Sequence, residues 1–155
     1  MAGTTRVSEV MSRRVHTLRP DQSIAEAAEM MASHGFGAMP VVGGDSRLLG
    51  LLRDEDLIVS EARVHVPTII NFLGATIPLP TSMHRFEEEI RKFAGGTVSE
   101  VMDEAPPVIG PEETLEELAT RMHEKDVTHL PVVDKGRVVG IVARGDLVRF
   151  IARTT

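Results

Sequence analysis

The chain has 155 residues, 42% of them apolar and 26% charged, which suits one globular domain or two small ones and excludes a disordered or collagen-like chain. With 17 basic and 23 acidic residues the formal net charge is -6, which opposes a role in non-specific nucleic-acid binding. The sequence contains no cysteine, so disulfides, thiolate nucleophiles and cysteine-containing zinc sites are excluded.

The first residues lack the features of a targeting segment. Residues 1–14 contain no apolar stretch of signal-peptide length, and nowhere do 18 uncharged apolar residues follow one another. The chain has five Phe and no Trp or Tyr, so stacking surfaces for single-stranded nucleic acid are not expected. We expect a soluble, cytoplasmic protein without a membrane or nucleic-acid partner.

An internal repeat organises the sequence. Val7-Ser-Glu-Val-Met11 recurs 91 positions later as Val98-Ser-Glu-Val-Met102, and Pro40-Val-Val recurs at the same offset. The second repeat then has one residue fewer in the predicted hairpin turn, and Asp56-Leu57 recurs at an offset of 90 as Asp146-Leu147. The predicted divisions are a flexible N-terminus at residues 1–5, a first repeat at 6–60, an insertion at 61–96 and a second repeat at 97–155.

The first repeat is predicted to hold a strand, a helix, two strands and a second helix. After an extended apolar piece, Ser23 and Glu26 have the spacing of a capping box at the start of a helix. The helix has its apolar residues at helical spacing and is expected to end near Gly35. The two following strands and the start of the last helix are expected at residues 39–42, at 48–52 and near Asp54.

The insertion has no counterpart within either repeat. Residues 64–80 are apolar and interrupted by proline and glycine, while residues 86–93 have the pattern of a short amphipathic helix. Apolar side chains left in water would cost about 25 cal/mol per Å² of exposed surface. We expect the following ones to pack on the repeats or on a second subunit: Ile69, Ile70, Phe72, Leu73 and Ile77.

The second repeat has the same local signals. Thr114 and Glu117 have capping-box spacing, and the helix that follows is expected to end near Asp126. The two strands and the start of the last helix are expected at residues 130–133, at 138–142 and near Gly145. Each unit therefore has the predicted order strand, helix, strand, strand, helix.

Together and in order, these repeated features resemble a tandem pair of cystathionine beta-synthase (CBS) domains. They are the opening Val-x-x-Val-Met, the proline and acidic residue before a capped helix, the apolar-Pro-Val-Val strand, and Gly-apolar-apolar-x-x-x-Asp-apolar before the last helix. The resemblance covers about two thirds of the residues. It implies a mixed α/β fold in which two β-α-β-β-α units pack with pseudo-two-fold symmetry and leave two related clefts.

The resemblance also implies a function. Such modules dimerise through their helices and hold an adenine nucleotide (AMP, ADP or ATP) or an adenosyl compound such as S-adenosylmethionine in their clefts. They sense a metabolite and pass the signal to another protein, and they do not catalyse a reaction. We therefore expect a homodimeric regulatory sensor with no catalytic activity, whose downstream partner the sequence does not identify.

In the resembled family, an aspartate at the turn from strand to last helix holds the ribose of the ligand. Asp56 and Asp146 occupy this position, and a carboxylate can accept two hydrogen bonds from a vicinal diol. The alternative is an aspartate that the helix dipole favours near the helix N-terminus. Ribose binding by both aspartates is the interpretation that we adopt.

The predicted phosphate contacts depart from the family pattern. A serine or threonine usually stands three residues before the ribose aspartate, but here Arg53 and Ala143 stand there. We predict that Arg53 and Arg144 contact phosphate through charge-assisted hydrogen bonds, together with His129 on the preceding strand. The alternatives are two solvated surface arginines and a structural histidine.

The base of the ligand requires apolar and hydroxyl-bearing walls in each cleft. The residues predicted to form them are Thr17, Met39, Val41, Thr128, Leu130 and Val132. The alternative for the four apolar residues among them is that they are simply part of the core. Of the two clefts, the one with His129, Arg144 and Asp146 is slightly favoured for phosphate.

Other functions have weaker support. The six histidines lack the spacing of a metal site, and no phosphate-binding loop, nucleophile elbow or dinucleotide motif is present in the sequence. We expect neither a metal nor a required cofactor. The alternative to a sensor is a ligand-free dimeric scaffold that docks a protein partner through the apolar insertion.

Overall fold

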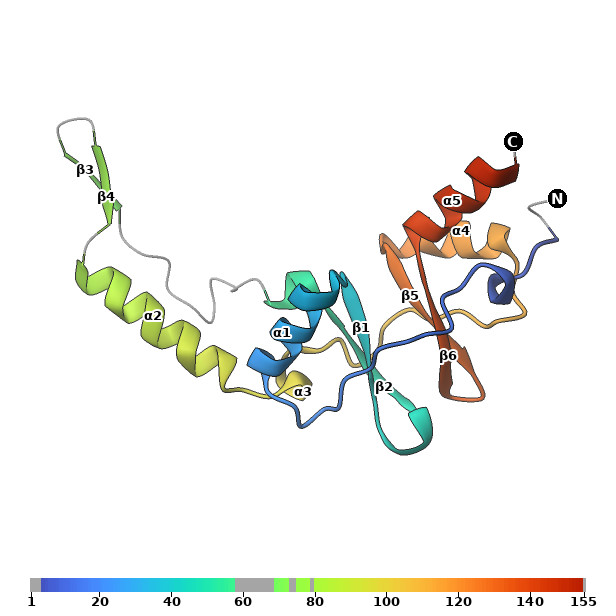
Figure 1. Ribbon diagram of the computed structural model, residues 1–155, viewed down its shortest axis with the longest axis horizontal. Helices are drawn as coiled ribbons and strands as arrows, with labels where there is room; N and C mark the ends of the chain where they lie inside the picture. The colour runs from blue at the N-terminus through green and yellow to red at the C-terminus, as the bar shows by residue number, and fades with distance from the viewer. Residues whose placement is uncertain (1–3, 58–68, 73–74, 79, 155) are drawn as a thin grey trace.

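The computed structural model describes residues 4–57, 69–72, 75–78 and 80–154 of the chain. Two similar halves lie side by side along the long axis, and an arm extends from one end (Figure 1). The α-helices are α1 (Ile24–His34), α2 (Pro80–Ala94), α3 (Val98–Val101), α4 (Leu115–Lys125) and α5 (Arg144–Thr154). The strands are β1 (Ala38–Val42), β2 (Leu48–Arg53), β3 (Ile69–Phe72), β4 (Ala75–Pro78), β5 (His129–Asp134) and β6 (Arg137–Ala143). Short 3₁₀ helices cover Val7–Glu9, Gly44–Ser46 and Asp54–Leu57.

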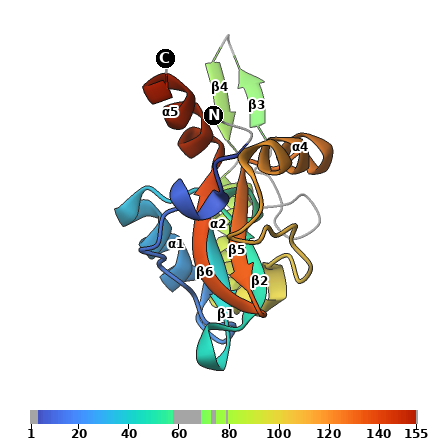
Figure 2. The same cartoon turned by 90° about the vertical axis from the view of Figure 1, so that its right-hand side faces the viewer.

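Each half contains a two-stranded antiparallel sheet, formed by β1 with β2 and by β5 with β6. Both sheets have a register irregularity at the same place, between the two valines of the Pro-Val-Val segment. The hairpin tips touch where the Leu48 amide donates a 3.0 Å hydrogen bond to the Gly136 carbonyl. Viewed along the long axis, one hairpin lies behind the other (Figure 2). The predicted mixed α/β fold with two repeated units is confirmed.

The hairpin turns explain why the offset between the repeats falls from 91 to 90. The turn between β5 and β6 has positive φ at Lys135 (53°) and Gly136 (81°), as a tight turn with two central residues in the left-handed region requires. Between the paired residues Val42 and Leu48 the first repeat has five residues, whereas the equivalent pair in the second repeat, Val133 and Val138, encloses four. The longer loop includes Gly44–Ser46, where Asp45 and Ser46 have φ of 59° and 61°. The extra residue is therefore accommodated within the turn.

The predicted helix ends are confirmed. Thr114 Oγ1 accepts a hydrogen bond from the Glu117 amide at 3.2 Å, and the Glu117 carboxylate accepts one from the Thr114 amide at 2.8 Å, which completes the capping box of α4. At α1, Ser23 Oγ accepts from the Glu26 amide at 3.1 Å, but the Glu26 carboxylate does not accept from the Ser23 amide, so the predicted box is only half formed. The C-caps Gly35 and Asp126 have φ of 69° and 50°, the left-handed conformation that ends a helix.

The opening segment of each repeat packs in the core of the other half. Val7 and Met11, at the start of the first repeat, belong to a buried cluster of second-repeat residues. Those residues are Ile109, Leu115, Leu118, Met122, Leu130, Val132 and Val142. Val98, at the start of the second repeat, is buried in turn among Leu18, Ala27, Met31, Met39, Val41 and Leu52. The two hydrophobic cores therefore do not coincide with the two sequence repeats.

Backbone hydrogen bonds fix these exchanged segments. Ser12 and Ile141 exchange two, at 2.9 and 3.0 Å, and Asp103 and Leu51 exchange two of the same lengths. These pairs join the end of each opening segment to β6 or β2 of the other half, so each half depends on the other for part of its sheet and of its core.

The first strand of each unit is shorter than the sequence predicts. Its extended part is a single parallel bridge, between Leu18 and Val41 in the first repeat and between Ile109 and Val132 in the second. The Val-Ser-Glu segments before it are helical turns, because their valines turn into the opposite core. The predicted last helix of the first repeat is represented by the 3₁₀ helix Asp54–Leu57, and the residues that follow lie outside the described part.

The insertion forms the arm in Figure 1. The helix predicted at residues 86–93 is confirmed within the longer α2, which begins at Pro80, a residue well suited to the first turn of a helix. The hairpin of β3 and β4 was not predicted, and its backbone lies at the end of α2 away from both repeats (Figure 1). Packing of its apolar side chains on the repeats or on a second subunit stays a prediction, and Leu73 lies outside the described residues.

Candidate functional site

A cleft of about 340 Å³ lies between the two halves. The segment after the exchanged opening residues, the turn between α1 and β1, and the strands and last helix of the second repeat all contribute to it. Its lining residues are Ser12, Arg14, Val15, His16, Gly35, Phe36, Gly37, Ala38, Pro40, His129, Ile141, Ala143, Asp146 and Arg149. Because both repeats supply walls, a molecule bound there would contact both at once.

Asp146 lies in this cleft at the start of α5. Its Oδ2 accepts a 2.7 Å hydrogen bond from the Ala143 amide, and its Oδ1 is paired with the Arg149 guanidinium. Asp56 makes the same turn-closing contact in the first repeat, where its Oδ2 accepts from the Arg53 amide at 2.8 Å. Both aspartates therefore stabilise the turn from strand to helix, and each carboxylate keeps lone pairs that could accept a hydroxyl. Ribose binding stays a prediction for both.

Two arginines that sequence reasoning did not select line the cleft. Arg149 follows Asp146 by three residues, which places both on one face of α5. Arg14 lies in the extended segment after the opening helix, and the corresponding residue of the second repeat is Ala105, so the repeat gave no signal for it. The helical spacing from Asp146 could have identified Arg149.

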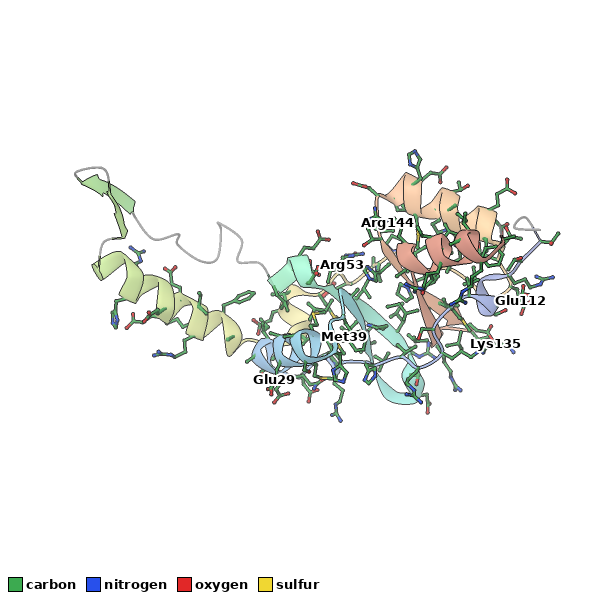
Figure 3. All side chains as sticks on the ribbon, turned by 45° about the horizontal axis from the view of Figure 1, so that its top comes forward. Glu29, Met39, Arg53, Glu112, Lys135 and Arg144 are labelled. Atoms are coloured by element: carbon green, nitrogen blue, oxygen red, sulfur yellow. The ribbon has the colours of Figure 1, made fainter. Side chains whose placement is uncertain are left out.

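The arginines predicted to contact phosphate lie elsewhere. Arg144 is exposed at the first position of α5 and is not among the residues that line this cleft. Arg53 forms an ion pair with Asp103, with 3.2 Å between Nη1 and Oδ2, and its side chain is 16% exposed. Figure 3 shows the two arginines, which belong to β2 and α5. Their predicted phosphate contacts remain predictions.

His129 joins the two halves at the edge of the cleft. It packs against Gly37 so closely that a Cβ on that glycine would lie 3.0 Å from the His129 Cε1 atom. Its Nδ1 lies 2.9 Å from the Thr128 hydroxyl. Burial lowers the pKa of His129 below its ordinary value of 6.5; Asp54 and Asp146 oppose this shift, and the two nearby arginines, Arg53 and Arg144, add to it. At neutral pH the neutral ring can offer a phosphate a hydrogen bond but not a charge.

The lowered pKa of His129 predicts a pH-dependent stability. The folded chain binds the histidine proton less tightly than the unfolded chain, so the free energy of unfolding decreases as pH falls below 6.5 towards the folded pKa. Above pH 6.5 both states hold a neutral ring and this contribution is absent. His129→Gln should flatten the stability profile between pH 5 and 7 in urea denaturation, whereas His123→Gln, at an exposed position on α4, should not. Equal profiles for wild type and His129→Gln would contradict the prediction.

Three aromatic rings gather beside the cleft. The ring centroids of His16 and Phe36 are 5.0 Å apart, and His34 lies 4.7 Å from His16 and 5.1 Å from Phe36, stacked on the latter at 8°. His16 and Phe36 line the cleft, so it has a partly aromatic wall. Sequence reasoning missed this wall, because residues 16 and 36 belong to different elements that meet through tertiary packing.

The residues predicted to contact the base are placed differently. Met39, Val41, Leu130 and Val132 are fully buried in the two cores. Thr17 is half-buried and Thr128 is exposed, and none of the six is among the residues that line this cleft. Their role in base binding is still a prediction, and the alternative that the apolar four belong to the core has support from their burial.

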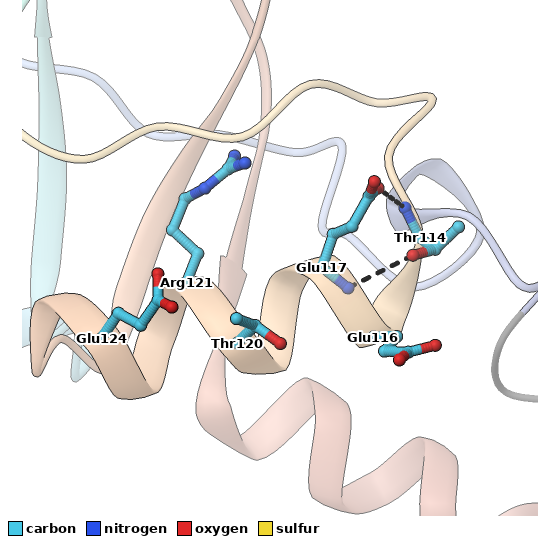
Figure 4. A pocket seen from close by; sticks show the side chains of 6 residues that line it. All are labelled: Thr114, Glu116, Glu117, Thr120, Arg121 and Glu124. Carbon is cyan, nitrogen blue, oxygen red and sulfur yellow. Dashed lines mark hydrogen bonds between the residues drawn. The ribbon is translucent and has the colours of Figure 1, made fainter.

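A larger hollow of about 480 Å³ runs along α4 (Figure 4). It is lined by one helix and its N-cap residue, through Thr114, Glu116, Glu117, Thr120, Arg121 and Glu124. Thr114 and Glu117 use their polar groups for the capping box. With three carboxylates and one guanidinium, this surface disfavours an anionic ligand. The cleft between the halves is the better candidate, because its polar groups converge from several elements.

Two kinds of feature are absent from the described residues. In that part of the chain, no helix combines the length and the apolar character needed to cross a lipid bilayer. The same residues contain no group of three or more histidine or acidic side chains placed to hold a metal ion.

Comparison with known proteins identifies the family. The family model of the CBS domain matches residues 7–62 and again residues 98–153. The CBS domain-containing protein YhcV of Bacillus subtilis is 33% identical over 141 residues, which cover 91% of this chain and 81% of YhcV. The chloroplastic CBS domain-containing protein CBSX1 of Arabidopsis thaliana is 28% identical over 152 residues. These cover 96% of this chain but 64% of CBSX1, so this chain spans less than two thirds of that relative.

A solved structure supports the same assignment. The crystal structure of CBSX2 of Arabidopsis thaliana in complex with AMP is similar to this fold with a TM-score of 0.72 and 25% sequence identity. The similarity covers 97% of this chain and 98% of the CBSX2 chain. The two matched segments span both repeats and include their exchanged opening residues, and the chain therefore belongs to the CBS domain family, with two CBS domains in tandem.

Proposed function

We propose that the chain is a regulatory module that binds an adenine nucleotide in the cleft containing Asp146. The observation that carries the proposal is the convergence of chemically different groups on one cleft between the halves. A carboxylate, two guanidinium groups, a half-buried histidine and an aromatic wall are what a ribose, a phosphate and a purine require. The bound AMP in CBSX2, a relative over nearly the whole chain, supports AMP as the first ligand to test.

Each part of the nucleotide has a proposed contact. The ribose hydroxyls would donate to Asp146, and the purine would pack on Phe36 and His16. Arg14 would face the phosphate. Arg149 would join it through the guanidinium N–H groups that its ion pair with Asp146 leaves available, since its side chain is 63% exposed. Together the two arginines place two positive charges beside the single negative charge of Asp146. The same contacts would accommodate ADP or ATP. An adenosyl compound such as S-adenosylmethionine has no phosphate to contact the arginines, so it would bind more weakly.

The proposed role is regulatory and not catalytic. A ligand in this cleft touches both repeats, and each repeat has its opening segment packed in the other half. Binding would therefore favour one relative placement of the two halves. That change could alter the contacts of the chain with a second copy in a homodimer or with a downstream protein.

Calorimetric titration of the ligand-stripped protein with AMP, ADP, ATP and S-adenosylmethionine tests the proposal. We expect AMP binding that Asp146→Ala weakens at least about tenfold, because a hydrogen bond to a charged group contributes about 1.5–3 kcal/mol. The control is Asp56→Ala, which loses the equivalent turn hydrogen bond but leaves this cleft intact. Saturating AMP, at about a hundred times its dissociation constant, should also raise the free energy of unfolding by about 2.7 kcal/mol. Equal AMP affinity in wild type and Asp146→Ala would refute the assignment of this cleft.

A ligand-free scaffold is the second candidate function. The arm formed by α2 and the hairpin of β3 and β4, which extends away from both repeats in Figure 1, favours it. This candidate predicts no heat and no stabilisation with any of the four ligands. It also predicts that removal of residues 61–96 abolishes capture of a protein partner while both repeats stay folded.

A further inference from the structure

The region that the repeat relates to the open cleft, called the second cleft below, contains an internal ion pair. The repeat relates Arg53 to Ala143 and Asp103 to Ser12, and both Ala143 and Ser12 line the open cleft. In the second cleft a guanidinium and a carboxylate therefore stand where the first has a methyl and a hydroxyl group. They lie 3.2 Å apart, and the side chains of Arg53 and Asp103 are 16% and 37% exposed.

The backbone around the ion pair matches that of the open cleft. Asp103 and Leu51 exchange the same two hydrogen bonds as Ser12 and Ile141. The Asp103 carboxylate is further fixed by the amide of Ala105, which donates to Oδ1 at 3.0 Å. At this point the two clefts therefore share their backbone hydrogen bonds and differ in their side chains. The hydrogen bond from Ala105 holds the Asp103 carboxylate where it can pair with Arg53.

The second cleft also lacks the side chains that equip the first. By the repeat, the positions of Arg14, His16 and Phe36 hold an alanine, a proline and a valine. These residues are Ala105, Pro107 and Val127. The position that corresponds to Arg149 in the sequence is Val59, which lies outside the described residues, and Arg53 is the cation at the described positions among these. That cation is already neutralised by Asp103.

We infer that the chain binds one nucleotide and not two, because the Asp103 carboxylate occupies the place of an anionic ligand on Arg53. This inference rests on the proposed function. The internal ion pair joins the opening of the second repeat to the end of β2. The Asp146 cleft alone then responds to ligand, and the pseudo-symmetric module behaves as a one-site sensor.

The test uses the full chain and AMP in calorimetric titration. Wild type should bind one AMP per chain. Asp103→Ser, which copies the residue of the open cleft, should release Arg53 and add a second, weaker binding event. That event should persist in Asp103→Ser/Asp146→Ala and disappear in Asp103→Ser/Arg53→Ala. Circular dichroism and melting temperature check that each variant is folded.

The outcomes separate the inference from the proposed function. Two AMP per wild-type chain, or one in both wild type and Asp103→Ser, overturns the inference and leaves the proposed function standing. No AMP binding to wild type with Arg53-dependent binding to Asp103→Ser overturns the proposed function and supports the role of Asp103. No binding to any variant overturns both.

Discussion

Replacement of Gly50 by alanine should lower the free energy of unfolding by about 1–3 kcal/mol, the cost of forcing extra volume into a packed core. A Cβ at Gly50 would lie 2.7 Å from the Asp103 carbonyl oxygen and 2.7 Å from the Met102 sulfur. The carbonyl cannot simply withdraw, because it accepts the 3.0 Å hydrogen bond from Leu51 that holds the exchanged segment. The clash therefore acts on the contact that joins the two halves.

The equivalent change at Gly140 should cost less. A Cβ there would meet the Met11 sulfur at 2.5 Å and the Ser12 carbonyl oxygen at 3.0 Å. The closer atom belongs to a flexible side chain that can change rotamer, and the backbone atom is further away than at Gly50. Gly50→Ala should therefore be the more destabilising of the two substitutions.

Urea denaturation of the two variants, with Gly44→Ala as control, tests this order. A Cβ on Gly44 would have no atom within 4 Å, and the φ of Gly44 is not positive, so alanine should be neutral or stabilising by a few tenths of a kcal/mol there. A Gly50→Ala midpoint equal to that of Gly44→Ala would show that the opening segment of the second repeat does not pack closely against β2.

Local features of the fold could be read from the sequence. The capping residues Ser23 and Thr114 and the helix ends at Gly35 and Asp126 lie where the pattern predicts them, because caps depend on residues within one or two turns. Gly50 and its counterpart were visible as repeated residues, but the reason for them was not. At Gly50 the reason is the approach of a segment about fifty residues away, and at Gly140 it is the approach of one about 130 residues away. No local sequence pattern reports either approach.

The same distinction applies to the candidate site. Asp146 and His129 were selected through the family resemblance, and both line the cleft. Arg14, His16 and Phe36 were missed because the opening segment and the turn after α1 meet the second repeat only through the exchange of segments. Comparison of the two repeats could not identify these residues, because they occur in the first repeat only and an alignment of the repeats shows only what both share.

Replacement of Leu130 by alanine separates a core role from a ligand-binding role. Leu130 is fully buried on β5, opposite Val142, in the cluster that receives Val7 and Met11. Removing its side chain should lower the free energy of unfolding by about 2–5 kcal/mol, through lost burial and the cavity left behind. Leu49→Ala is the matched control, because Leu49 is 37% exposed and should cost under about 1 kcal/mol.

The ligand affinity of the same variant decides between the two interpretations. If Leu130 is core, Leu130→Ala should keep the AMP affinity of its folded fraction within about twofold, whereas Phe36→Leu should weaken AMP binding without a comparable loss of stability. Stability comes from urea denaturation, and affinity from calorimetry at a temperature where each variant is folded. A large loss of AMP affinity in Leu130→Ala with little loss of stability would instead show that Leu130 contacts the base of the ligand. The cleft lined by Phe36 would then be a secondary surface, because the purine would have to lie against β5.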